Sequence, residues 1–248
     1  MAAPPPLASW PGMSRHDGST ACRTVGQHAR GHFQPVLVPP AGSVTGLQRP
    51  VPELILASAS SARRALLVAA ALNFTVKPAD IDEGTVKREA RAAGADAAAT
   101  ALRLAELKAQ VVAQDNRESL VIGADQLLVC DDVWFDKPAD VSSAAEQLRR
   151  LRGRTHELIT AATCYQGDTR LWHHVVAPRL AMRHFSDGFL DAYLEHEKDA
   201  VTTSVGGYRL EGLGVHLFDA IEGEHSAILG LPMLALLRFL RQRRFLVA

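Results

Sequence analysis

The sequence lacks the features that mark several well-defined classes of protein. Of its 248 residues only three are cysteines, Cys22, Cys130 and Cys164, and their odd number and wide spacing exclude a disulfide framework or a zinc knuckle. The longest apolar run, Ala65–Leu72, is too short to cross a bilayer, so we expect no membrane contact. No basic segment followed by an apolar one opens the chain, which predicts a cytoplasmic protein.

Excess charge of either sign is also absent. The chain has 27 Lys and Arg residues against 27 Asp and Glu residues, so its formal net charge is zero. This balance argues against a protein that holds nucleic acid mainly through general attraction to phosphates. The phosphate loop GxxxxGK[ST] is missing as well, which disfavours the P-loop NTPases. Hydrophobic residues at 47% and charged residues at 22% are ordinary values for a soluble globular protein.

The first 52 residues differ in composition from the rest of the chain. They contain nine of the thirteen prolines and show no helical or strand period. We therefore expect a disordered N-terminal extension over residues 1–52, and Met13 leaves a misassigned start codon as an alternative. A folded domain is predicted for residues 53–242, followed by a short tail at 243–248.

Short apolar runs alternate with helical patterns within residues 53–242, and no internal repeat is present. The patterns predict strands at 54–57, 74–77, 120–123, 127–130, 133–135, 157–165, 171–185 and 215–218. They predict helices at 62–72 and 96–114, one opened by a capping box at 143–146, one capped by Ser186, and a final one near Pro232 with Leu234, Leu237 and Leu240 inward. The fold class is therefore α/β with a mixed sheet.

The segment Ser58–Arg64 lies between a predicted strand and a predicted helix. Backbone N–H groups at the helix start, serine hydroxyls and two arginines would converge there, which suits a phosphate. The alternative is a serine cap followed by a solvated arginine pair.

Two further segments carry charge in unusual places. The acidic cluster Asp80–Glu83 could hold a hard divalent cation through oxygen ligands, or it could be a solvated acidic turn. Lys108 lies on the apolar stripe of its predicted helix, where it either extends its ammonium group to solvent or meets an anion in a cleft.

Asp125 lies between two apolar runs, each of which is typical of a strand. An unpaired carboxylate is costly in such surroundings, so the side chain is either paired or kept as a base or metal ligand, and we favour the functional role. Lys137 follows the predicted hairpin and could add a second cation near the same site.

Glu211 lies in a glycine-rich segment, Gly206–Gly214. Glycines let the backbone approach a ligand closely, and the carboxylate could accept two hydrogen bonds from the edge of a base. The alternative is a loop glutamate that pairs with Arg209.

Taken in order, these segments resemble the Maf family of nucleoside triphosphate pyrophosphatases. The matching stretches are Leu56–Ser60 with Arg63, Asp80–Glu83, Leu104–Ala105 with Lys108–Ala109, Ile122–Asp125, Lys137–Pro138, Gly153–Glu157, Glu211–Gly214 and Gly230–Pro232. They cover roughly residues 53 to 242. Each motif alone has low specificity, whereas eight in the same order make a strong signal.

The resemblance implies a two-lobed α/β fold with a mixed, twisted sheet flanked by helices and a nucleotide cleft between the lobes, often as a homodimer. It implies hydrolysis of the α–β phosphoanhydride of a nucleoside triphosphate to the monophosphate and pyrophosphate, with Mg²⁺, Mn²⁺ or Co²⁺. Carried over to this sequence, the resemblance gives Asp125 as the proton acceptor, Ser58, Arg63, Lys108 and Lys137 as triphosphate ligands, and Glu83 with Asp125 as metal ligands.

Three positions bear on the substrate. Maf proteins that act on dTTP and UTP usually have arginine, threonine and glutamine where this chain has Ala62, Gln126 and Glu211. Gln126 and Glu211 resemble the subgroup that hydrolyses 7-methyl-GTP, although Ala62 replaces the tryptophan of that subgroup. A carboxylate can accept from guanine N1–H and the exocyclic amine together. The alternatives are a dTTP/UTP or broad-range pyrophosphatase, or a nucleotide-binding regulator of septum formation with little catalysis.

Overall fold

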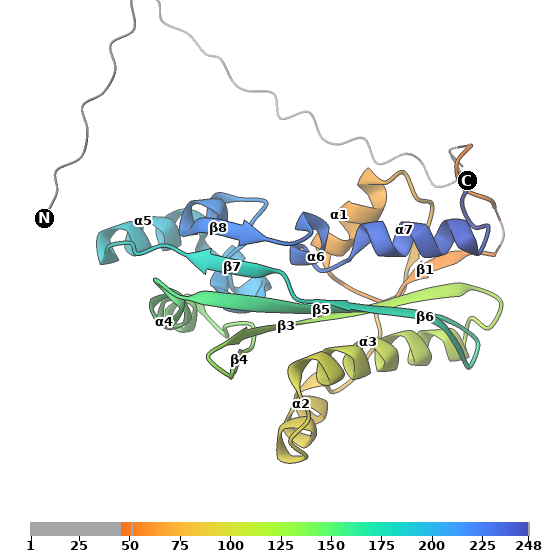
Figure 1. The fold of residues 1–248 in the computed structure, drawn as a ribbon, viewed down its shortest axis with the longest axis horizontal. Coiled ribbons are helices and arrows are strands. Elements are labelled where there is room, and N and C mark those ends of the chain that lie inside the picture. Colours follow the sequence, from red (N-terminus) through yellow and green to blue (C-terminus); the bar gives the residue numbers. More distant parts are fainter. Residues whose placement is uncertain (1–45, 51, 248) are drawn as a thin grey trace, which may run out of the picture. The chain divides into compact units, whose positions relative to one another are not determined.

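Two long antiparallel strands, β3 (Leu120–Cys130) and β5 (Thr155–Gln166), form the centre of the fold (Figure 1). The structure is a computed structural model that describes residues 46–50 and 52–247, and these belong to one unit, Val38–Ala248. The sheet has eight strands in the order β2-β1-β3-β5-β7-β8, with β4 beside β3 and β6 beside β5. β1 is parallel to β2 and β3, whereas the other pairs are antiparallel. The predicted α/β class with a mixed sheet is confirmed.

The other elements are six strands, seven helices and three 3₁₀ turns in the described part of the chain. The other strands are β1 (Leu54–Leu56), β2 (Thr75–Val76), β4 (Val133–Phe135), β6 (Thr169–Val176), β7 (Arg179–Met182) and β8 (Phe218–Glu222). The helices are α1 (Ser61–Ala69), α2 (Glu83–Ala92), α3 (Ala97–Gln114), α4 (Val141–Leu151), α5 (Asp187–Glu197), α6 (His225–Ile228) and α7 (Met233–Gln242). Three 3₁₀ turns cover Lys198–Thr203, Val205–Gly207 and Leu213–Leu217.

The alternation of side chains along β3 assigns its two faces to different helices. Figure 1 shows α3 on one face of the sheet and α1 with α7 on the other. Leu120 and Ile122 share a buried cluster with residues of α1 and α7, whereas Val121 packs with residues of α3. Because successive side chains point to opposite faces, Asp125 faces α3 and Gln126 faces away from it.

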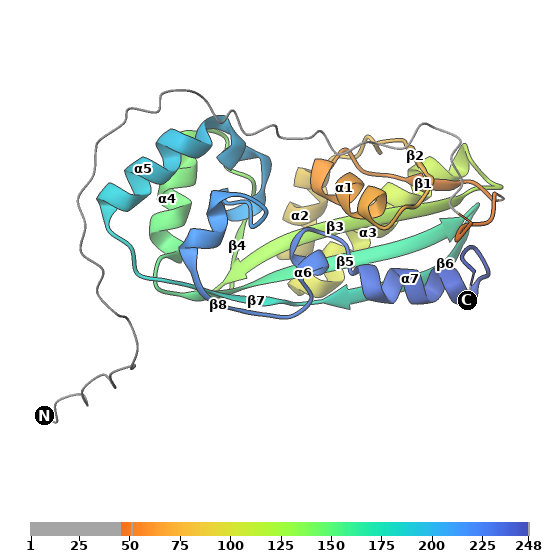
Figure 2. The ribbon, with the colours of Figure 1, turned by 90° about the horizontal axis from the view of Figure 1, so that it is seen from above.

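A second buried cluster lies toward the other end of β3 and β5. There Leu128 and Leu158 pack with residues of α4, α5 and the 3₁₀ turns. Figure 2 shows α4 and α5 at one end of the long strands and α1 and α7 at the other. Two lobes therefore share one sheet, because β3 and β5 are long enough to contribute to both cores.

One edge of β3 is left open in the middle. β5 pairs with β3 from Val121 to Val129, but on the opposite edge β1 pairs with residues 120–122 and β4 with residues 128–130. The backbone between those two short strands therefore faces the space between the lobes, and Asp125 and Gln126 lie in this interval.

Several predicted strands differ from the observed ones. Residues 124–126 do not interrupt a strand, because β5 pairs with β3 straight through them. The predicted strand at 171–185 is instead two strands, β6 and β7, divided at Pro178, which has no N–H for the ladder. Residues 215–217 form a 3₁₀ turn, and the strand that was expected there, β8, begins at Phe218.

Two helix predictions are also wrong in detail. The cap of α4 is Asp140, whose side chain accepts from the Ser143 N–H at 2.7 Å, so the helix begins before the predicted capping box. In α7 the buried residues are Met233, Leu236, Phe239 and Leu240, while Leu234 is 68% exposed. The apolar residues of α7 fit two neighbouring stripes, and the contacts with α1 and β3 select one of them.

The ends of the described chain meet each other. The predicted extension lies mostly outside the described residues, as does Cys22, but Gln48 and Leu246 form a bridge and Arg49 N–H donates to the Phe245 carbonyl at 2.9 Å.

Cys130 and Cys164 are buried thiols. None of the helices in the described part of the chain has the length and hydropathy that a membrane span requires.

His156 on β5 is a buried imidazole with one hydrogen-bonded nitrogen. Its Nε2 lies 2.7 Å from the Tyr208 hydroxyl, whereas Nδ1 is buried and has no hydrogen-bond partner within residues 46–50 and 52–247. Burial lowers the pKa of His156 from 6.5 to about 4. The unfolded chain therefore binds the proton more readily than the folded chain. The contribution of His156 to the free energy of unfolding falls as the pH drops below 6.5, and it stops changing below about pH 4.

We expect the free energy of unfolding to fall by about 2 kcal/mol between pH 7 and pH 5 through His156 alone. Urea unfolding of wild type and His156→Gln at both pH values measures this term, because glutamine does not titrate. His173→Gln removes an exposed imidazole and is the matched control. An equal pH dependence in wild type and His156→Gln would contradict the prediction.

Candidate active site

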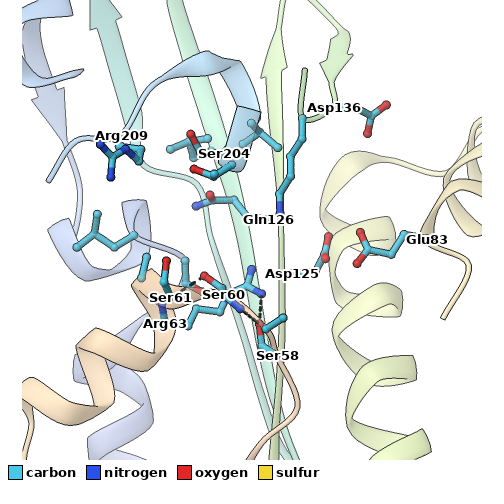
Figure 3. Close-up of a pocket in the computed structure, with 18 of the residues that line it drawn as sticks. Ser58, Ser60, Ser61, Arg63, Glu83, Asp125, Gln126, Asp136, Ser204 and Arg209 are labelled. Atoms are coloured by element: carbon cyan, nitrogen blue, oxygen red, sulfur yellow. Dashed lines mark hydrogen bonds between the residues drawn. The ribbon is translucent and has the colours of Figure 1, made fainter. Parts of the chain in front are cut away.

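A cleft of about 970 Å³ opens beside the unpaired edge of β3 (Figure 3). One wall comes from the start of α1, from α2 and from α3, and the other from the loop after β4 and from the segment Ala200–Glu211. The cleft brings together every residue that the sequence singled out for the reaction and its specificity, namely Ser58, Ala62, Arg63, Glu83, Lys108, Asp125, Gln126, Lys137 and Glu211.

The start of α1 presents a fixed arginine to the cleft. Ser60 caps the helix by accepting from the Arg63 N–H. The guanidinium of Arg63 is buried and donates to three neutral oxygens: Nε to Gly230 O at 3.0 Å, and Nη1 to Ala124 O at 2.9 Å and to Ser58 Oγ at 3.0 Å. The Ala124 carbonyl belongs to the open edge of β3.

The charge of Arg63 is not neutralised by direct contact with a carboxylate. Burial lowers the pKa of Arg63, and the negative charges of Asp125 and Glu83 partly offset that effect. A guanidinium stays protonated in proteins. Its Nη2 makes no hydrogen bond to the described residues, so it remains a donor for an anion in the cleft.

Lys108 joins two carboxylates at the floor of the cleft. Its Nζ lies 2.6 Å from Asp125 Oδ1 and 2.7 Å from Glu83 Oε1. The Asp125 side chain is 5% exposed, and its second oxygen, Oδ2, is buried without a hydrogen-bond partner among the residues that the structure describes. An unpaired carboxylate oxygen is costly to bury, so this atom is the strongest indication of function in the cleft.

Glu83 differs from its acidic neighbours. Residues 80–82 lie in a loop, and Asp82 caps α2 by accepting from the Thr85 N–H at 2.9 Å. Glu83 is the first residue of the helix and the only member of the acidic cluster that lines the cleft. Burial raises the pKa of Glu83, but the adjacent charge and hydrogen bond of Lys108, with Lys87 and Lys137 beyond, outweigh it and lower the pKa. Glu83 is therefore ionised at neutral pH.

Close packing of α3 on β3 brings Lys108 to Asp125. Gly123 and Asp125 lie on the same face of β3. A Cβ at Gly123 would lie 2.2 Å from the Ala105 carbonyl oxygen and 2.8 Å from the Ala109 Cβ. Only glycine lets the helix approach this closely, so Gly123 sets the separation across which Lys108 reaches the carboxylate.

Asp125 and Glu83 fit a divalent cation that is completed by a substrate. Mg²⁺ is commonly held by one or two carboxylates together with substrate phosphates and water. Both carboxylates line the cleft and therefore offer oxygen ligands to a cation there. Among the described residues no group of three His, Cys, Asp or Glu side chains could hold a metal, so a cation here would depend on phosphate oxygens for its remaining ligands.

The cleft carries more positive than negative side chains. The cations are Arg63, Lys87, Arg88, Arg91, Lys108, Lys137 and Arg209, and the anions are Glu83, Asp125, Asp136 and Glu211, so seven against four leaves an excess of three. Lys137 is exposed at the end of β4. The excess favours a multiply charged anion such as a triphosphate.

Sequence reasoning missed the contribution of α2. Lys87 lies 2.7 Å from Asp136, and Lys87, Arg88 and Arg91 all line the cleft. Their spacing, together with the cap at Asp82, was a signal for a helix with one basic face.

Gln126 follows Asp125 on β3 and has its side chain on the opposite face of the strand. The amide Nε2 of Gln126 donates to Thr160 Oγ1 at 2.7 Å and to the carbonyls of Ala227 and Ile228, both at 3.1 Å. These contacts fix the amide, so that Oε1 keeps its acceptor capacity. Figure 3 shows Asp125 and Gln126 pointing to opposite sides of β3.

Glu211 does not form the pair with Arg209 that was the alternative to a role in binding the base. Arg209 binds Glu197 instead, with Nη2 at 2.7 Å and Nε at 3.1 Å from Oε2. Among the described residues no hydrogen bond or ion pair engages the Glu211 carboxylate, which lines the cleft and is exposed. The alternative reading of Glu211 as a paired loop residue is therefore wrong.

Comparison with known proteins identifies relatives over most of the chain. The family described as "Maf-like protein" matches residues 53–243. A "Nucleoside triphosphate pyrophosphatase" of Granulibacter bethesdensis is 53% identical over 194 residues, which is 78% of this chain and 98% of the relative. A protein of the same name from Gluconobacter oxydans is 50% identical over 79% of this chain and 97% of its own length. A "7-methyl-GTP pyrophosphatase" of Rhizobium meliloti is 47% identical over 77% and 96%.

Proposed function

The chain belongs to the Maf family, and we propose that it is a nucleoside triphosphate pyrophosphatase that cleaves between the α and β phosphates. The observation that carries the proposal is the buried Asp125 Oδ2, an unpartnered carboxylate oxygen in a cleft with an excess of cations. The names of the relatives agree with this activity.

In the proposed reaction Asp125 acts on water. Oδ2 accepts a proton as the water oxygen bonds to the α phosphorus and the bond from that phosphorus to the bridging oxygen breaks, giving the monophosphate and pyrophosphate. Lys108 holds Asp125 Oδ1 at 2.6 Å, which orients the carboxylate.

The cations of the cleft stabilise the phosphates. Nε and Nη1 of Arg63 make three hydrogen bonds that fix the guanidinium, and Nη2 is left as a donor to the phosphates. Little reorganisation is therefore needed when charge develops on phosphate oxygens. Lys137 and the basic side chains of α2 line the same cleft and would neutralise the leaving pyrophosphate. A divalent cation held by Asp125 and Glu83 would supply further neutralisation of the triphosphate.

We propose 7-methyl-GTP as the preferred substrate. The support is the unpaired carboxylate of Glu211, the fixed amide of Gln126 and the name of the Rhizobium meliloti relative. A carboxylate accepts from guanine N1–H and the exocyclic amine together, whereas uracil and thymine offer one such donor. Ala62 at the cleft leaves room beside the base.

The test is pyrophosphate release by the purified protein with Mg²⁺, on 7-methyl-GTP, GTP, UTP, dTTP and CTP. The expected result is release that depends on the metal and is greatest with 7-methyl-GTP. Preference for UTP or dTTP would overturn the substrate but keep the reaction. Nucleotide binding without release from any substrate would favour a binding regulator.

Glu211→Gln is expected to lower the ratio of kcat/KM for 7-methyl-GTP to that for UTP by about 10- to 100-fold, because a hydrogen bond to a charged acceptor is worth about 1.5–3 kcal/mol. Steady-state rates on both nucleotides measure the ratio. Glu222→Gln on β8 removes an exposed carboxylate outside the cleft and should leave the ratio unchanged. An unchanged ratio in Glu211→Gln would assign base selection to other residues.

The cytoplasmic location and the homodimer stay predictions. The expected absence of nucleic-acid and membrane partners rests on the balanced charge and the short apolar runs of the sequence.

A further inference from the structure

Glu197 is a buried carboxylate that the proposed reaction does not use. Its side chain is 5% exposed. Oε2 accepts from Arg209 Nη2 at 2.7 Å and from Nε at 3.1 Å, and Oε1 accepts from the Leu213 N–H at 3.3 Å. Both oxygens of Glu197 are thus bound to the loop that contains Glu211.

The position of Glu197 follows from the spacing of buried residues on α5. Leu190, Tyr193 and Glu197 are three and four residues apart, so they share the inward face of the helix. Tyr193 donates its hydroxyl to the Gly207 carbonyl at 3.3 Å. The last two turns of α5 therefore hold the loop at Gly207, Arg209 and Leu213.

The loop wraps tightly around this carboxylate. A Cβ at Gly212 would lie 3.3 Å from Glu197 Oε1 and 3.5 Å from Arg209 Nη2. A Cβ at Gly214 would lie 2.3 Å from the Arg209 carbonyl oxygen. The two glycines on either side of Leu213 thus allow the close fit, and any group larger than hydrogen at these positions disturbs it.

The ion pair also determines which carboxylate Arg209 binds. Arg209 lies two residues from Glu211 and lines the cleft beside it. Its hydrogen bonds to Glu197 are the main reason that the pKa of Arg209 is raised. With its Nε and Nη2 occupied by Glu197, the guanidinium leaves Glu211 with no ion-pair partner among the described residues.

We propose that Glu197 is a positioning residue for selection of the nucleobase: it clamps Arg209 and the Leu213 amide, so that Glu211 stays unpaired and faces the cleft. This inference rests on the proposed function, because it concerns the same site. Glu197 itself does not touch the substrate. Loss of the clamp lets Arg209 turn to Glu211, which then competes with the base for the carboxylate.

Glu197→Gln tests the clamp. Glutamine retains an acceptor and nearly the same shape but loses the charge that holds Arg209. The expected result is a fall of about tenfold in the ratio of kcat/KM for 7-methyl-GTP to that for UTP, caused by a higher KM for 7-methyl-GTP, with kcat on UTP within about twofold of wild type. Glu195→Gln, which changes an exposed carboxylate on the same helix, should leave both quantities unchanged.

Gly212→Ala is the second variant, since loss of a buried charge can unfold a chain. It keeps both charges and places a methyl group against the Glu197 carboxylate, so it should shift the ratio in the same direction while the Tm stays within a few degrees of wild type. An unchanged ratio in a folded Glu197→Gln or Gly212→Ala protein overturns the clamp. An equal fall in the Glu195→Gln control overturns it as well.

Failure of the proposed function is distinguishable from failure of the clamp. If the wild type releases no pyrophosphate from any nucleotide, the proposed function fails. Calorimetric titration with 7-methyl-GTP and UTP then tests the clamp alone, because the ratio of the Kd for 7-methyl-GTP to the Kd for UTP should rise about tenfold in Glu197→Gln and stay unchanged if the clamp has no role.

Discussion

Asp125→Asn is expected to lower kcat for pyrophosphate release by about 10²- to 10⁴-fold, the range typical of a lost general base. Asparagine has nearly the same shape and keeps a carbonyl oxygen that accepts from Lys108, so the local packing should survive. It has no oxygen that takes up a proton at neutral pH. Steady-state release from 7-methyl-GTP with Mg²⁺ measures the loss, and nucleotide binding by calorimetry should change only a few-fold.

The matched control for Asp125→Asn is Asp168→Asn. Asp168 lies in the turn between β5 and β6, outside the cleft. Its exposed carboxylate pairs with Arg117, which precedes β3. The same chemical change there should leave kcat within about twofold of wild type, because exposed ion pairs contribute little. A kcat for Asp125→Asn within tenfold of wild type would remove Asp125 from the role of proton acceptor.

The cost of burial marked two residues of the cleft in the sequence. Asp125 stood between apolar runs, and Lys108 lay on an apolar stripe, so each needed a partner or a function. The structure pairs them with each other at 2.6 Å. The position of each residue along its own element was enough to identify it as a candidate. The contact between the two depends on how α3 packs on β3, which the sequence pattern does not show.

Residues that act through tertiary contacts were beyond this kind of reasoning. Glu197 and Arg209 are twelve residues apart and meet only because α5 and the following loop fold back together. The amide of Gln126 is fixed by carbonyls about a hundred residues further along the chain. Spacing in the sequence contains no signal for such pairs, so the only partner that the sequence offered for Arg209 was the local one, Glu211.

Some predicted strand boundaries were wrong for a related reason. The apolar pattern of 171–185 continues through Pro178, yet the ladder ends where a residue lacks its N–H. On β3 the predicted break is absent, because the strand stays paired with β5 at the polar residue Asp125. The open edge between β1 and β4 is a property of the assembled sheet, and it is this edge that creates the cleft.

Gly123→Ala is expected to damage stability and catalysis together. The added Cβ would lie 2.2 Å from the Ala105 carbonyl oxygen, which is backbone and moves only if α3 moves. Overpacking of this kind costs about 1–3 kcal/mol, and each kcal/mol lowers the Tm of a domain of this size by about 2–4 °C. A shift of α3 by about 1 Å would also misplace Lys108 and Asp125, for which a loss of roughly 10²-fold in kcat is typical.

Two variants separate this close approach from a general effect of removing glycine. Gly188→Ala changes a glycine of α5 whose added Cβ has only Ser186 Oγ at 4.0 Å nearby, so Tm and kcat should be retained. Ala109→Gly combined with Gly123→Ala removes the side-chain contact at 2.8 Å but leaves the Ala105 oxygen, and it should not restore kcat. Full recovery in the double variant would mean that the Ala109 methyl group, rather than the helix backbone, sets the distance between Lys108 and Asp125. A lowered Tm with unchanged kcat in Gly123→Ala would instead show that catalysis tolerates displacement of α3.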